Sequence, residues 1–270
     1  MTWKTVVMRS GPPETPVEIP GAVRALIATR PFEVVWRNEL GGLTLRVGST
    51  STGVHVKWAP VTSGLDLDGE RRRLEWARTY TPVPEVLDAG ADGDGSWLVM
   101  RSIDARNAVT SRWIEEPGTA SVALGRGLRA MHDALPLATC PFEWSVATRV
   151  REVDDRGARP LDAFEGVTVT PDHDPTASLD DLGAIPPEDL VVCHGDACAP
   201  NTLLDGAGRC VAHVDLGRLG VADRWADLAV MAWSTVWNYG PGWERHVYDG
   251  YGVEADVEKI RYYRLLWTLE

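Results

Sequence analysis

The stretch from residue 188 to residue 217 constrains the fold of this chain more than any other. Its start, EDLVVCHGD, is an apolar β-strand pattern that runs into a loop, and TLL and CVAHVDLG are further strand patterns separated by the turn GAG. Asp196, Asn201 and Asp215 each stand at or just beyond a predicted strand end. A hairpin would bring these three side chains together, so the sequence predicts a cleft with two carboxylates and an amide.

Such an oxygen-rich set suits Mg²⁺, which keeps several waters and takes one or two carboxylates together with phosphate oxygens. One carboxylate and the amide could then hold the ion, which leaves the remaining carboxylate free to accept a proton. Taken singly, Asn201 after a proline is an ordinary turn residue, and Asp215 could cap a backbone turn. His194 is expected to be structural, packed beneath the loop.

The order of these residues matches the template of a protein kinase. That template has His-x-Asp, an asparagine five positions after the aspartate and a later Asp-x-Gly, preceded by a strand lysine and a helical glutamate. His194-Gly-Asp196, Asn201 and Asp215-Leu-Gly217 follow that order here, while Lys57 ends the strand pattern VHVK and Glu70 opens the next predicted helix. Taken singly, Lys57 could be an edge-strand residue, and Glu70 could simply favour a helix N-terminus. These separate explanations do not predict that all the residues occur in the order of the kinase template.

Two other phosphate-binding motifs are missing. The chain has no G-x-x-x-x-G-K-[ST], and ELGGLTLR is not a G-x-G-x-x-G loop. A P-loop ATPase or a dinucleotide enzyme is therefore disfavoured. The loop from Leu40 to Thr44 can still cover phosphates through backbone N–H groups, so we expect Gly41 and Gly42 to contact the nucleotide.

The periodicity of the chain changes from strand-like to helical. Residues 33–59 alternate apolar and polar side chains around Gly, Ser and Thr, which predicts antiparallel hairpins. One helix follows in LDLDGERRRLEWARTY, and strand patterns return at residues 83–87 and 96–103. From about Thr119 an apolar stripe of helical period takes over, and the chain ends in a helical segment.

This change predicts an α+β fold with two lobes joined near residues 101–106. Residues 1–102 are expected to form a nucleotide-binding lobe with an antiparallel sheet and one key helix, in which residues 1–20 are irregular. Residues 103–270 are expected to form a larger, mainly helical lobe for catalysis and acceptor binding. Within it, residues 144–189 read as a variable insert, either a solvated acidic face or a lid for a cation.

Charge and composition narrow the partners. The formal net charge is −12, from 39 acidic against 27 basic residues, which disfavours nucleic acid or an anionic membrane and favours a cationic small molecule. The four cysteines form no C-x-x-C pair and are expected to be reduced thiols. We find no signal peptide pattern and no apolar run of membrane-spanning length, and expect a cytoplasmic monomer or weak dimer.

At this point the chain resembles the aminoglycoside O-phosphotransferase family, in particular its 3′-phosphotransferase branch. The segments that carry the resemblance are VCHGDACAPNTLL, VDLGRLGVADRWADLAV, LRAMHDALPLATCPF, VKW with GERRRLEWA, and KIRYYRLL. The resemblance implies a bilobal protein-kinase-like fold. It also implies transfer of the γ-phosphoryl group of ATP, or alternatively GTP, to a hydroxyl of a small molecule with the help of Mg²⁺.

The resemblance gives the nucleotide side of the site. It implies that Lys57 contacts the α and β phosphates and pairs with Glu70. The backbone of the hinge between the lobes, at Arg101 and Ile103, would hydrogen-bond adenine, with Met100 beside it.

The resemblance also assigns roles around the transferred group. It implies that Asp196 orients and deprotonates the acceptor hydroxyl while Asn201 and Asp215 hold Mg²⁺. Arg218, in the segment GRLG, would lie near the acceptor or the transferred phosphate. Asp227 would brace the catalytic loop from a helix.

The acceptor side departs most from the family pattern. Trp267 and Thr268 stand where the branch has an acidic pair, and Leu40 replaces a phosphate-loop serine. We expect the acceptor to be bound by Asp196 and Arg218 together with residues from the insert and the tail. These are Asp154, Asp155, Glu165, Trp267 and Glu270.

The residues agree with two functional hypotheses and disfavour two others. A kinase that confers resistance by phosphorylating an aminoglycoside, at its 3′-hydroxyl, agrees with the negative charge. A kinase of another small hydroxyl compound, an antibiotic or a metabolite, agrees with the flat apolar Trp267. A non-catalytic nucleotide-binding protein is disfavoured because Lys57, Asp196, Asn201 and Asp215 are all present, and a protein kinase because no A-P-E-like segment follows.

Overall fold

The structure is a computed structural model that describes residues 11–13, 15–38, 40–49, 52–156 and 178–270. The described residues fall into two compact units, one ending at Ala105 and the other beginning at Arg106. Each unit is described by itself.

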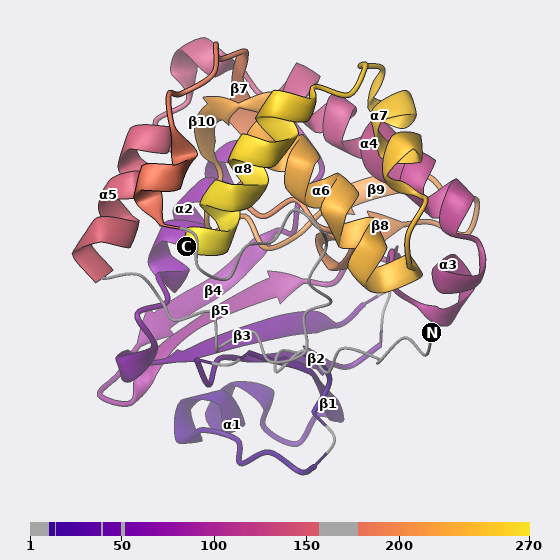
Figure 1. Cartoon of the computed structure of the whole chain (residues 1–270). Coiled ribbons are helices and arrows are strands. Elements are labelled where there is room, and N and C mark those ends of the chain that lie inside the picture. Colours follow the sequence, from indigo (N-terminus) through magenta and orange to yellow (C-terminus); the bar gives the residue numbers. More distant parts are fainter. Residues whose placement is uncertain (1–10, 14, 39, 50–51, 157–177) are drawn as a thin grey trace. The chain divides into compact units, whose positions relative to one another are not determined.

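The first unit is built on an antiparallel sheet with the strand order β1-β2-β3-β5-β4 (Figure 1). Its strands are β1 Phe32–Arg37, β2 Leu43–Val47, β3 Val54–Pro60, β4 Val86–Ala91 and β5 Gly95–Arg101. Its helices are α1 Gly21–Ile27 and α2 Leu67–Ala77, with the short 3₁₀ helix η1 at Val61–Ser63. The predicted hairpins within residues 33–59 are confirmed.

The strand expected at residues 83–87 lies further along the chain. Strand β4 begins at Val86, passes a register shift before Asp88 and continues to Ala91. Gly90 lies inside this strand and is paired with Trp97 of β5. A Cβ atom at Gly90 would lie 2.3 Å from the Trp97 ring, so glycine is here because the tryptophan needs the space above the strand.

The two helices of this unit cover opposite faces of the sheet (Figure 1). Val23 and Ile27 of α1 pack against a cluster of buried sheet residues that includes Leu45 and Val56. Side chains alternate between faces along a strand, so Lys57, next to Val56, points to the face that carries α2. The sequence did not predict α1.

Helix α2 has a clear start signal. Asp66 caps it by accepting a hydrogen bond from the Gly69 N–H at 2.8 Å. Acidic Asp68 and Glu70 follow in the first turn, where they suit the positive end of the helix dipole. The buried Leu74 fixes the face that turns to the sheet and so places Glu70 beside β3.

The second unit is mainly helical, as expected. Its helices are α3 Ser111–Glu115, α4 Pro117–Ala134, α5 Val146–Arg156, α6 Arg224–Tyr239, α7 Glu244–Tyr251 and α8 Val257–Leu269, with 3₁₀ turns η2 Leu137–Thr139, η4 Leu179–Leu182 and η5 Ala199–Asn201. Strands β6 Arg106–Asn107, β8 Thr202–Leu204 and β9 Cys210–His213 form one small antiparallel sheet, and β7 Leu190–Cys193 pairs with β10 Gly220–Asp223. No helix in the described residues is long and apolar enough to cross a membrane.

Helices α4, α6, α7 and α8 pack side by side over these strands (Figure 1). Their shared core includes Leu124 and Leu128 of α4 and Leu266 of α8. The start of α6 is fixed by the buried Asp223, whose carboxylate accepts from the Trp225 N–H at 2.7 Å and from Lys259 Nζ at 2.6 Å. Asp223 therefore sets the position of the helix that supports the site.

Candidate active site

The loop after β7 carries the predicted base. Asn201 donates two hydrogen bonds from its side-chain nitrogen, one to the backbone carbonyl of Asp196 and one to Asp196 Oδ2, each at 3.0 Å. The turn η5 provides this geometry, because it reverses the chain between the two residues. The predicted approach of Asp196 and Asn201 is confirmed.

The hairpin of β8 and β9 brings the second aspartate to the same loop. Thr202 pairs with His213, and beyond the ladder the Val214 N–H donates to the Asn201 carbonyl at 2.9 Å. Asp215 follows with a φ of 65°, in the left-handed region that non-glycine residues rarely adopt. Strained backbone of this kind persists where the surrounding structure enforces it, and it is concentrated at functional sites.

His194 ties the two ends of this arrangement together. Its Nδ1 accepts from the Asp196 N–H at 3.2 Å, which leaves the proton on Nε2 for donation to the Val214 carbonyl at 2.9 Å. The side chain is fully buried, and this structural position was expected.

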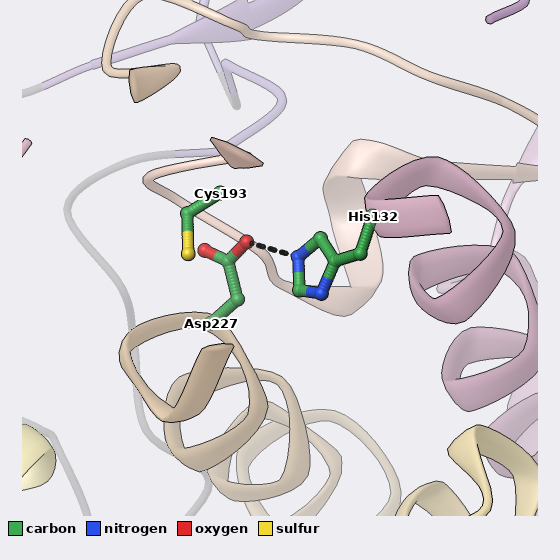
Figure 2. A group of neighbouring side chains, drawn as sticks. All are labelled: His132, Cys193 and Asp227. Atoms are coloured by element: carbon green, nitrogen blue, oxygen red, sulfur yellow. Dashed lines mark hydrogen bonds and ion pairs between the residues drawn. The ribbon is translucent and has the colours of Figure 1, made fainter. Parts of the chain in front are cut away.

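A buried carboxylate on α6 braces the loop from below. Asp227 Oδ2 accepts from the His194 N–H at 2.6 Å, and its Oδ1 accepts from the Gly195 N–H at 3.0 Å. His132 of α4 lies 3.0 Å away through Nε2 (Figure 2). Burial alone would raise the pKa of Asp227, but these hydrogen bonds and the neighbouring histidines hold it below its usual value. The predicted bracing role is confirmed.

Cys193 lies beside this pair, and the three side chains have the composition of a metal-binding group (Figure 2). Their chemistry argues against that role. Burial raises the pKa of the Cys193 thiol, which donates to the Asp223 carbonyl at 3.2 Å instead of acting as a thiolate ligand. Both oxygens of Asp227 already accept hydrogen bonds. The group is therefore a hydrogen-bonded support.

The residues expected to hold Mg²⁺ fit that ion. The two hydrogen bonds made by the Asn201 nitrogen turn its oxygen away from Asp196. That oxygen and the Asp215 carboxylate are hard ligands of the kind Mg²⁺ prefers. No sulfur or ring nitrogen takes part in this set, so softer metals are not favoured.

In the first unit, Lys57 and Glu70 form the expected ion pair. Lys57 Nζ donates to both carboxylate oxygens of Glu70, at 2.7 and 2.9 Å. The two side chains are 15% and 6% exposed, so the ammonium is held in one place with little screening by water.

The expected adenine-binding segment follows β5. Met100 is buried, the Arg101 N–H donates to the Glu85 carbonyl, and the Ser102 N–H donates to the Gly53 carbonyl. Ser102 Oγ lies 3.0 Å from His55 Nδ1, which fixes the segment further. Ile103 is half-buried, and its amide N–H pairs with no backbone carbonyl in the described residues.

The expected phosphate loop is closed by its own hydrogen bonds. The Gly41 N–H donates to the Asn38 carbonyl at 3.1 Å, and the Gly42 N–H donates to Asn38 Oδ1 at 2.7 Å. Both amides are therefore engaged within the turn, and their contact with phosphate stays a prediction.

On the acceptor side, Arg218 Nη1 donates to Glu270 Oε2 at 2.9 Å. Trp267 packs on Trp233 and Trp237, with ring centroids 5.7 and 5.2 Å apart. Asp154 and Asp155 are exposed on α5, and Glu165 lies outside the described residues.

Sequence reasoning missed one residue of this region. Arg149 of α5 is buried and donates through Nε to Glu270. Val146, Arg149 and Val153 are spaced at three and four residues and are all buried. An arginine in an otherwise apolar stripe was the available signal.

The fold and the site define a kinase-like phosphotransferase. Residues 43–263 match the model of the phosphotransferase enzyme family, and the chain belongs to that family. An aminoglycoside 3′-phosphotransferase from Streptomyces fradiae is 38% identical over 221 residues, which are 77% of this chain and 81% of the relative.

Solved structures agree with this assignment. The crystal structure of a type VIII aminoglycoside-3′-phosphotransferase covers 92% of this chain and 97% of its own, with a TM-score of 0.76 and 30% identity. An aminoglycoside phosphotransferase from Streptomyces rimosus, in complex with ADP and streptomycin, covers 92% and 95%, with a TM-score of 0.66 and 25% identity. The predicted kinase-like α+β fold is confirmed.

Proposed function

We propose that this enzyme transfers the γ-phosphoryl group of ATP to the 3′-hydroxyl of an aminoglycoside antibiotic and so confers resistance. The observation that carries the proposal is the hydrogen-bonded convergence of Asp196, Asn201 and the Val214–Asp215 backbone at one loop. The 3′-phosphotransferase relative supports the acceptor class, and the structure with ADP supports the nucleotide.

Asp196 is the proposed general base. The Asn201 amide holds its Oδ2, which leaves the other carboxylate oxygen to accept the proton of the acceptor hydroxyl. Phosphoryl transfer requires little covalent work from the protein, so orienting this carboxylate and the acceptor supplies much of the catalysis.

Asn201 Oδ1 and the Asp215 carboxylate would hold Mg²⁺. When bound, the ion neutralises charge that develops on the transferred group. Lys57, fixed by Glu70, would donate to the α and β phosphates, and the backbone of Arg101 and Ile103 would recognise the base. GTP stays an alternative nucleotide. The cytoplasmic location and the monomer or weak dimer also stay predictions.

A kinase of a less cationic hydroxyl compound is the second candidate. The contacts of Trp267 with two further tryptophans favour it, because they form an aromatic cluster rather than an acidic wall. The Glu270 carboxylate is also occupied by Arg149 and Arg218 instead of being available to an ammonium group.

The test is ADP release with Mg·ATP over a panel of kanamycin, its analogue without the 3′-hydroxyl, streptomycin, a macrolide and no acceptor. We expect turnover with kanamycin that disappears for the 3′-deoxy analogue. Asp196→Asn should lower kcat by about 10³-fold or more, as expected for removal of a positioned catalytic group. Asp249→Asn, an exposed position on α7, is the matched control and should behave as the parent enzyme.

Each result separates the candidates. Turnover of the 3′-deoxy analogue would move the reaction to another hydroxyl. Silence across the aminoglycosides, with ATP binding intact by calorimetry, would reject them as acceptors and leave the less cationic compounds. Full activity of Asp196→Asn would remove the proposed base.

A further inference from the structure

Three charged side chains from distant parts of the second unit meet at the edge of the catalytic loop. Glu270, at the end of α8, shares its carboxylate between two arginines: Arg149 of α5 on Oε1 and Arg218, after β9, on Oε2. Two guanidinium groups and one carboxylate leave the cluster with a net charge of about +1.

Arg218 is attached to the catalytic loop through its backbone. A Cβ atom at Gly195 would lie 2.3 Å from the Arg218 carbonyl oxygen and 2.5 Å from the Arg218 Cβ, and Gly195 has a φ of +89°. Only glycine allows this approach. Arg218 therefore starts from a fixed point one residue away from Asp196, while its guanidinium, with a side chain 46% exposed, depends on Glu270 for its direction.

Arg149 is in turn the anchor of Glu270. The Arg149 side chain is 1% exposed, and its guanidinium carbon lies 4.0 Å from the centroid of the Trp144 ring. The backbone N–H of Trp144 donates a hydrogen bond to the Val221 carbonyl of β10 at 3.1 Å, and this bond holds Trp144 in place. The Glu270 carboxylate, 5% exposed, is thus held by an arginine that is itself buried and stacked on Trp144.

Stability alone does not explain this arrangement. Nη1 and Nη2 of Arg149 are buried and have no hydrogen-bond partner among the residues that the structure describes, which is unfavourable for a charged group. Replacing a buried ion pair by apolar side chains of similar volume is often neutral or stabilising. A position that only filled space between α5 and α8 would be better served by methionine or leucine.

We propose that Arg149 and Glu270 form a positioning pair, which holds the Arg218 guanidinium beside Asp196. From that place Arg218 stabilises the negative charge of the transferred phosphoryl group. The inference rests on the proposed function, because it takes Asp196 as the base. Phosphoryl transfer is accelerated by donors fixed in advance where charge develops, so a loosely held arginine would contribute less.

The test compares Arg149→Met, Arg149→Lys, Arg218→Met and Glu270→Gln with the control Arg126→Met, at an exposed position on α4. We expect Arg149→Met to lower kcat at least tenfold without changing the affinity for ATP, while its melting temperature stays the same or rises. Arg149→Lys should recover part of the loss. The double variant Arg149→Met/Arg218→Met should be no slower than Arg218→Met alone, because both changes remove one function.

Several outcomes would overturn the inference. Parental kcat in Arg149→Met, or single effects that multiply in the double variant, would show that Arg149 does not act through Arg218. A lower melting temperature with unchanged kcat would assign it a packing role. If Arg149→Met does not fold, the same cycle with Glu270→Gln and Arg218→Met decides. Asp196→Asn is measured in parallel: its full activity would reject the proposed function, whereas its inactivity beside a fully active Arg149→Met would reject only the positioning pair.

Discussion

At the residue scale, the site depends on side chains that use their two polar atoms on different partners. The side-chain nitrogen of Asn201 donates hydrogen bonds to Asp196, and these bonds determine where the side-chain oxygen points. His194 makes a similar division between the Asp196 N–H and the Val214 carbonyl. One amide can thus orient the base and offer a metal ligand at the same time.

Substitutions at Asn201 should separate these two tasks. Asn201→Ala removes both, so kcat should fall about 10²-fold and the Mg²⁺ concentration for half-maximal activity should rise about tenfold. Asn201→Asp keeps an oxygen ligand but loses the donor to Asp196 and adds a like charge, so kcat should fall with little change in the Mg²⁺ requirement. Magnesium titrations at saturating ATP measure both. Equal Mg²⁺ requirements in the two variants would argue against Asn201 as a ligand.

At the element scale, the support of the catalytic loop reaches back to the contact between α4 and α7. His132 of α4 accepts or donates a hydrogen bond of 2.8 Å with the Tyr251 hydroxyl of α7 and also contacts Asp227. The two helices approach closely at Gly125, where a Cβ atom would lie 2.0 Å from the Val247 carbonyl oxygen. The contact there is between the backbones of α4 and α7, so neither helix can move away without a large cost in free energy.

Gly125→Ala should therefore destabilise the enzyme although alanine favours helices. Helix propensity alone predicts a gain of about 1 kcal/mol, whereas overpacking in a close contact typically costs about 1–3 kcal/mol or more. We expect a lower melting temperature and a lower kcat, because α4 carries His132. Gly118→Ala in the same helix is the control, since its nearest contact is the movable Trp243 ring at 3.2 Å. A raised melting temperature in Gly125→Ala would contradict the expected clash.

At the scale of the whole molecule, sequence patterns predicted what depends on local order and spacing. The order of Lys57, Glu70, Asp196, Asn201 and Asp215 was sufficient to indicate kinase chemistry, because few other reactions require those residue types in that order. The contacts that these residues make within each unit are the ones expected from the predicted strands, the hairpin and one helix face.

The features that were missed depend on contacts between distant segments. Nothing in the sequence near Gly90 reveals that the Trp97 ring will lie over it. Arg149 reads as a surface residue because periodicity counts arginine as polar, and only its contacts with Glu270 and Trp144 make it buried. Glu270 is 121 residues from Arg149, and Trp97 lies on the strand next to Gly90, so local periodicity does not reveal these two contacts.

A buried histidine at the centre of the second unit predicts how the protein responds to acid. Burial, followed by the electrostatic effect of the neighbouring His194, lowers the pKa of His213 from 6.5 to about 3. In the unfolded chain this side chain takes up a proton below about pH 6.5, while the folded chain keeps it neutral. Between these values the unfolded state binds more protons, so the free energy of unfolding falls as the pH falls, by up to about 1.4 kcal/mol for each pH unit.

His213→Gln should remove this dependence while keeping a polar group near Thr202, whose Oγ1 lies 3.3 Å from His213 Nδ1. Urea unfolding at pH 7, 6, 5.5 and 5 would compare the two proteins above the range in which carboxylates titrate, about pH 4. We expect the parent to lose stability more steeply than the variant over this range. His246→Gln, on α7, controls for the loss of any one histidine. If the free energy of unfolding depends on pH equally in the parent and in His213→Gln, folding does not lower the pKa of His213. The interior beside the catalytic loop would then accept a charged imidazole more readily than its burial implies.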